Sequence, residues 1–149
     1  FHDEVLKTPE VDVHKRPDSF DLEYEAKVKN MLKNMKHQII QSHLSGFDAQ
    51  GIDGVFKILI VCENEKGEDM QDIRIDRLVN RRGISVEEGK REVNDREINH
   101  LEKWRRLYED NDESWTYWDK KYHDLIINTY SHNKEETLKI ALEKMEYNK

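Results

Sequence analysis

The 149-residue sequence has one cysteine and two prolines, and it lacks a long hydrophobic run. A single cysteine excludes an intramolecular disulfide and favours a reducing, cytoplasmic compartment. The longest apolar run, VFKILIVC at residues 55–62, is much shorter than the ~20 residues that a membrane-spanning helix needs. We also find no signal-peptide pattern. These absences predict a cytoplasmic protein without a membrane partner.

The 32 acidic residues outnumber the 25 basic ones, so the formal net charge is −7 and the pI is about 5.5. This balance argues against a nucleic-acid partner, although a local basic patch can still bind phosphate. Hydrophobic residues make up 36% and charged residues 38% of the chain. Three tryptophans, six tyrosines and four phenylalanines argue against disorder. The length corresponds to about one domain.

The histidines and the cysteine do not form a metal-binding motif. None of the seven histidines has a partner at zinc-ligand spacing, so we expect no metal site. Cys62 is interpreted as a small buried strand residue. The tryptophans and several tyrosines gather at residues 104–122, where we expect them to pack against the sheet or a protein partner. Stacking on nucleotide bases is the alternative.

Apolar periodicity predicts helices that alternate with strands. The helices are expected at residues 1–7 (the end of a helix), 20–36, 70–82, 85–108 and 134–147. The strands are expected at residues 37–42, 55–62 and 122–129. Gly83 suits a helix C-terminus, and S-V-E-E at residues 85–88 is a capping box. The alternation predicts an α/β fold with a parallel sheet.

Arginine is concentrated in one segment, because eight of the nine arginines lie within residues 74–106 while 16 lysines are spread along the chain. One interpretation is a solvated helix with local ion pairs, such as Glu87–Arg91 and Glu92–Arg96. The other is a phosphate-binding segment, since the planar guanidinium fits phosphate oxygens in a bidentate manner that lysine cannot reproduce. The residues alone leave both interpretations open.

Three segments, taken in order, resemble the cytidylate kinases, in particular the compact archaeal type of nucleoside monophosphate kinase. Residues 39–50, IIQSHLSGFDAQ, resemble the strand and turn at the monophosphate site, which read V-I-E-G-R-L-S-G-W. Residues 74–97, RIDRLVNRRGISVEEGKREVNDRE, resemble the helix, turn and mobile lid. Residues 122–129, YHDLIINT, and the following KEETLKIALEKM resemble the Y-D-L-V-I-N-T strand and closing helix. The resemblance spans roughly residues 18–147.

The resemblance implies a fold and a reaction. The fold would be the three-layer α/β parallel sheet of the P-loop nucleoside monophosphate kinases, with residues 1–149 as the C-terminal part of one domain and a lid at about residues 82–110. The reaction would transfer the γ-phosphoryl group of ATP, with Mg²⁺, to a pyrimidine monophosphate, CMP or dCMP. The expected partners are therefore nucleotide substrates.

The resemblance also assigns roles to individual residues. Lid arginines that neutralise charge on the transferred phosphoryl group would be Arg91 and Arg96. The substrate-binding positions would be His43, Ser45, Gly46 and Asp48. Arg82 and Lys103 would support the lid.

The sequence departs from the family at several positions. The P-loop, G-x-x-x-x-G-K-[ST], is not among these 149 residues, so we expect it on an upstream strand, in a first segment of about 40 residues. His43 and Glu23 stand where the family has arginine, and Glu102-Lys103-Trp104 replaces the lid sequence R-R-Y. Two alternatives follow. One is a catalytically inactive relative that senses nucleotides or binds proteins, and the other is a general acidic interaction domain.

Overall fold

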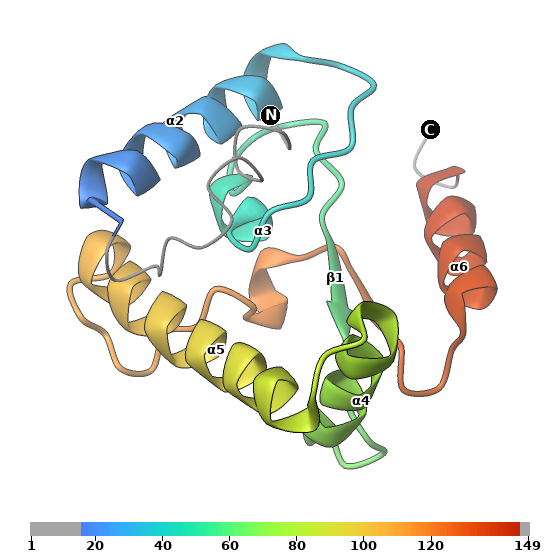
Figure 1. Ribbon diagram of the computed structural model, residues 1–149. Helices are drawn as coiled ribbons and strands as arrows, with labels where there is room; N and C mark the ends of the chain where they lie inside the picture. Colours follow the sequence, from blue (N-terminus) through green and yellow to red (C-terminus); the bar gives the residue numbers. More distant parts are fainter. Residues whose placement is uncertain (1–15, 147–149) are drawn as a thin grey trace.

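The computed structural model describes residues 16–146, apart from the side chains of Arg96 and Glu146 (Figure 1). The helix predicted at residues 1–7 lies outside this range. The helices are α2 (Asp18–Asn34), α3 (Ser45–Asp48), α4 (Gln71–Arg82), α5 (Val86–Tyr108) and α6 (Lys134–Glu146). The strands are β1 (Ile58–Val61) and β2 (Leu125–Asn128), and a short 3₁₀ turn, η2, covers Lys120–Tyr122. The predicted positions of the four long helices within the described range are confirmed to within about two residues.

The two strands form a parallel pair whose register runs from Ile58 opposite Leu125 to Val61 opposite Asn128. The second and third predicted strands are therefore present and parallel, and the structure shows that they are neighbours, although both are shorter than predicted. The strand predicted at residues 37–42 is wrong, since these residues have no regular structure and Ile39 is 93% exposed. A strand needs a hydrogen-bonded neighbour, and within residues 16–146 this segment has none.

The corner between α4 and α5 forms from local signals. Gly83 ends α4 with a left-handed φ of 67°, a conformation that favours glycine, and its N–H donates to the carbonyl of Val79 at 2.8 Å. Ser85 then begins α5 with the predicted capping box, in which its hydroxyl accepts from the Glu88 N–H while the Glu88 carboxylate accepts from the Ser85 N–H. The predicted ends of both helices at this corner are therefore confirmed.

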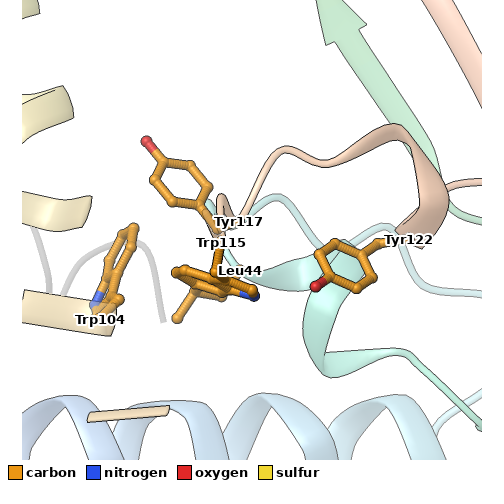
Figure 2. Packing of buried hydrophobic residues seen from close by; sticks show 5 residues of the cluster. All are labelled: Leu44, Trp104, Trp115, Tyr117 and Tyr122. Carbon is orange, nitrogen blue, oxygen red and sulfur yellow. The ribbon is translucent and has the colours of Figure 1, made fainter. Parts of the chain in front are cut away.

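The principal core is aromatic and lies between α3, α5 and the segment before β2. Five buried residues form it: Leu44, Trp104, Trp115, Tyr117 and Tyr122 (Figure 2). Phe47 of α3 meets Trp115 and Tyr122 edge to face, with ring centroids 5.3 and 5.5 Å apart. Such contacts stabilise beyond the area they bury, so the predicted packing role of these aromatics is confirmed.

The other side of the sheet is more open. Figure 1 shows α6 separated from α2 and α5 by the strands. Ile60 of β1 is 53% exposed, and Leu138 and Leu142 of α6 are also exposed. Cys62, just after β1, is buried as predicted, and the Arg77 Nη1 lies 3.8 Å from its Sγ. Within the described range, no helix has the length and apolar character required to cross a membrane.

Candidate functional site

The segment that resembles a monophosphate site, residues 39–50, turns into α3. The Ser45 hydroxyl donates to the carbonyl of Ser42 at 2.9 Å and so stabilises the turn. Gly46 lies against the ring of His123, because a Cβ at this position would be 2.2 Å from the His123 Nε2. Burial lowers the pKa of His123, which favours the neutral ring in this contact. Ser45 and Gly46 thus shape the turn that holds Asp48.

A cavity of about 270 Å³ lies between α2 and the end of α3. It is lined by Lys29, Lys33, Phe47, Asp48, Gln50 and Ile52. The Lys29 Nζ is 3.1 Å from Asp48 Oδ1 and 5.8 Å from the centre of the Phe47 ring. Of the four predicted substrate-binding residues, Asp48 is the one that lines this cavity. The cavity therefore combines two cations, a buried carboxylate and an aromatic wall.

A second buried acid stands beside Asp48. Burial raises the pKa of Glu25 to about 9, and the hydrogen bond with Asp48 and the negative charge of Asp48 add to the shift. Glu25 consequently keeps its proton at neutral pH and can donate it in a hydrogen bond to the Asp48 carboxylate. The two acids together carry a single negative charge, which Lys29 partly balances.

Lys103, the predicted lid-support residue, ties α5 to the start of α2. Its buried ammonium lies 2.7 Å from Asp21 Oδ2 and donates to the carbonyl of Arg16 at 2.6 Å. Arg16 also pairs with Asp21. One turn further along α5, the Arg106 guanidinium binds both carboxylate oxygens of Asp18, at 2.7 and 2.9 Å. Because a buried cation needs such partners, Lys103 is fixed in this position.

Most of the clustered arginines bind groups of the protein itself. Arg77 donates to the hydroxyl and carbonyl of Thr129, at 3.1 and 2.8 Å. The other pairings are Arg74 with Asp69 and Glu97, Arg82 with Glu92, Arg105 with the carbonyls of Glu113 and Trp115, and Arg106 with Asp18. These arginines are therefore bound within the protein, but mostly through contacts between different elements rather than through the predicted local ion pairs along one helix. Arg82, predicted to support the lid, joins α4 to α5 through Glu92.

Two arginines differ from the rest. Arg81 and Arg91 are exposed, and neither makes a hydrogen bond or an ion pair with the residues that the structure describes. The predicted Glu87–Arg91 ion pair is therefore wrong, while the side chain of Arg96 is outside the description. Arg91 is in the first two turns of α5, close to α4, and Figure 1 places that corner well away from α2 and α3. The structure thus does not bring Arg91 and the cavity together.

His43 lies outside the cavity lining as well. Its ring packs against His100, Trp104 and Tyr117, with centroid distances of 5.2, 5.9 and 5.9 Å. His43 therefore extends the aromatic core at its exposed edge. Within residues 16–146 there is no group of three or more His, Cys, Asp or Glu side chains placed to hold a metal ion.

Sequence reasoning missed Glu25, Lys29 and Lys33. These residues are spaced by four along α2, which places them on one face of the helix. That spacing is a usable signal, although it does not show which neighbour the face meets. Comparison of the chain with protein-family models, with curated proteins and with solved structures finds no match.

Proposed function

We propose that this chain is the acceptor side of a nucleoside monophosphate kinase of the cytidylate type. With a P-loop segment present, the protein transfers the γ-phosphoryl group of ATP to CMP or dCMP. The observation that carries the proposal is the cavity beside Asp48. It lies at the segment that resembles the monophosphate site, and it offers cations for a phosphate group, an aromatic wall and a carboxylate acceptor.

The sheet supports the three-layer fold assumed in this proposal. Within the described range β1 has only β2 as a neighbour, so its other edge has unpaired backbone groups. Parallel sheets are normally covered on both faces, and Ile60 of β1 is exposed. A P-loop strand added along β1 would pair with these backbone groups.

The chain's own residues would contribute binding and charge neutralisation. In the reaction, a monophosphate oxygen forms a new bond to the γ-phosphorus of ATP while the bond to the ADP leaving oxygen breaks. The exposed Arg91 guanidinium is available to bind the oxygens of the transferred group once the lid closes. Among the described residues, no group of three or more His, Cys, Asp or Glu side chains is placed to hold Mg²⁺, so the metal and the remainder of the ATP triphosphate would be bound by the P-loop segment.

Turnover by the whole protein, expressed from its native start, tests this function. ADP formation is followed with ATP and Mg²⁺ in the presence of CMP, dCMP, UMP and AMP in turn. We expect turnover with a pyrimidine monophosphate, and a loss of about 100-fold or more in kcat for Arg91→Ala and for Arg96→Ala. Arg81→Ala is the matched control, an exposed arginine without an assigned role, and should stay within about twofold of the wild type. Folded protein without turnover on any of the four would overturn the proposal.

The second candidate is a catalytically inactive relative that senses nucleotides or binds proteins. One observation favours it: Arg74 and Arg82 form ion pairs within the chain, and Arg77 donates hydrogen bonds to Thr129. Few guanidinium groups are therefore left to bind a substrate. It predicts that CMP or dCMP binds without ADP formation. In that outcome, Arg91→Ala would leave nucleotide affinity unchanged.

A further inference from the structure

The cavity between α2 and α3 contains two lysines for which the sequence resemblance assigns no role. We infer that Lys29 and Lys33 form the phosphate-binding site of the acceptor pocket, in place of the arginines that the resembled family has at the positions of Glu23 and His43. This inference rests on the proposed function and names the residues that recognise the anionic end of the acceptor. The ligand class is a phosphate monoester.

Both lysines line the same cavity. Lys29 and Lys33 are one helical turn apart on α2. Lys29 is held by its ion pair with Asp48, which fixes one cation in place before a ligand arrives. Lys33 is exposed and makes no hydrogen bond or ion pair with any described residue. It is therefore free to bind an anion without breaking an existing contact.

The charges of the lining residues also favour an anion. The two lysines contribute two positive charges, and Asp48 contributes one negative charge. Glu25, the buried neighbour of Asp48, stays protonated at neutral pH and adds no charge, because burial and Asp48 raise its pKa. The cavity thus keeps one net positive charge. A phosphate monoester, which carries between one and two negative charges near pH 7, is attracted to such a site.

The residues at the positions of the family's arginines cannot bind the phosphate in their place. Glu23, on α2, is itself an anion, and the His43 ring packs against His100, Trp104 and Tyr117. The remaining lining of the cavity suits the rest of the ligand. Phe47 and Ile52 present apolar surface next to the lysines, and Gln50 presents an amide. The site is therefore built for a molecule with one phosphate end and a larger, less polar body.

The test is a titration of the whole protein with inorganic phosphate, and separately with CMP, followed by two-dimensional ¹H–¹⁵N NMR. We expect the amides of Gln50 and Ile52 to shift with either titrant. Lys33→Ala should weaken phosphate binding at these amides about tenfold, and Lys33→Glu should abolish it. Lys27→Ala is the matched control, since Lys27 is an exposed lysine of the same helix that does not line the cavity, and it should stay within about twofold. Lys33 is exposed, so its variants should fold, which an unchanged far-UV spectrum verifies.

The outcomes separate this inference from the proposed kinase function. Phosphate binding that depends on Lys33, without turnover of any monophosphate, keeps the inferred anion site and refutes the kinase. Turnover with an unchanged KM for CMP in Lys33→Ala keeps the kinase and refutes the inference. Shifts confined to other amides, or equal affinities in Lys33→Ala and Lys27→Ala, also refute the inference.

Discussion

The two sides of the sheet differ in how completely their apolar side chains are covered. On the side of α3 and α5, Trp115 is 4% exposed and its neighbours in the aromatic core are buried as well. On the side of α6, Leu142 is 50% exposed although it lies in a regular helix. We infer that burial stabilises the described chain mainly on the aromatic side, while the α6 side has apolar side chains that no described residue covers.

The largest effect should follow from opening the aromatic core. Trp115→Ala removes a fully packed ring, and we expect a loss of about 3–5 kcal/mol in the free energy of unfolding. Urea unfolding followed by circular dichroism measures it. Trp118→Ala is the control, because Trp118 is 37% exposed and should cost much less. Equal losses in the two variants would contradict the expectation that the buried ring of Trp115 contributes more than a partly exposed ring at the margin of the same core.

The next effect depends on pH and belongs to the two buried acids between α2 and α3, Glu25 and Asp48. Glu25 has a pKa of about 9 in the folded protein against an ordinary 4.5, so the folded state holds this proton more tightly than the unfolded chain. Its contribution to stability is complete below pH 4.5 and is lost as the pH rises through about 9. Between these values the free energy of unfolding should fall by up to ~1.4 kcal/mol per pH unit.

Glu25→Gln removes this titration, because the amide keeps a hydrogen-bond donor for Asp48 but has no proton to lose. We expect the free energy of unfolding of Glu25→Gln to depend less on pH between pH 5 and 9 than that of the wild type. Urea titrations at several pH values in this range measure it. Glu23→Gln, at an exposed position of the same helix, serves as the control. A pH profile of Glu25→Gln that overlays the wild type would show that Glu25 is ionised in the folded protein.

A smaller effect should come from the close contact beneath the turn at α3. Gly46→Ala places a Cβ against the His123 ring, where it must displace the ring or the backbone. We expect a cost of about 1–3 kcal/mol, and a large part of it should disappear when His123→Ala is introduced in the same chain. A double-mutant cycle from thermal unfolding measures the coupling. Additive effects would mean that the turn, rather than the ring, opposes the alanine.

The smallest effect is expected on the open side. Leu142→Ala removes a half-exposed side chain and introduces a better helix former, so the cost should be below ~1 kcal/mol. The same urea titration that is used for Trp115→Ala measures it. A loss as large as that of Trp115→Ala would mean that Leu142 is covered in solution and that the two sides of the sheet do not differ in packing.

Local features of the fold were predictable from the sequence. The end of α4 at Gly83 and the start of α5 at Ser85 depend on neighbouring residues alone, and both were predicted correctly. The irregular structure of residues 37–42 could not be predicted in this way, because whether an apolar segment forms a strand depends on a partner that the local sequence does not contain. The same reason explains why β1 and β2 are shorter than their apolar runs.

The candidate site was only partly predictable. Asp48 could be chosen from its segment, but its pairing with Lys29 and Glu25 depends on how α2 packs over α3. For the arginines, the sequence shows the cluster but not the partners. The hydrogen bond from Arg77 to the carbonyl of Thr129, 52 residues away, depends on the pairing of β1 with β2.

The single thiol at the end of β1 provides a native reporter of local opening. Reagents attack an accessible thiolate, and Cys62 is only 5% exposed beneath the Arg77 guanidinium. Labelling must therefore wait for a fluctuation that lifts this guanidinium and uncovers the strand end. The labelling rate, measured against denaturant, gives the free energy of that fluctuation from an unmodified chain. Comparing it with the free energy of global unfolding shows whether this strand end opens separately or together with the aromatic core.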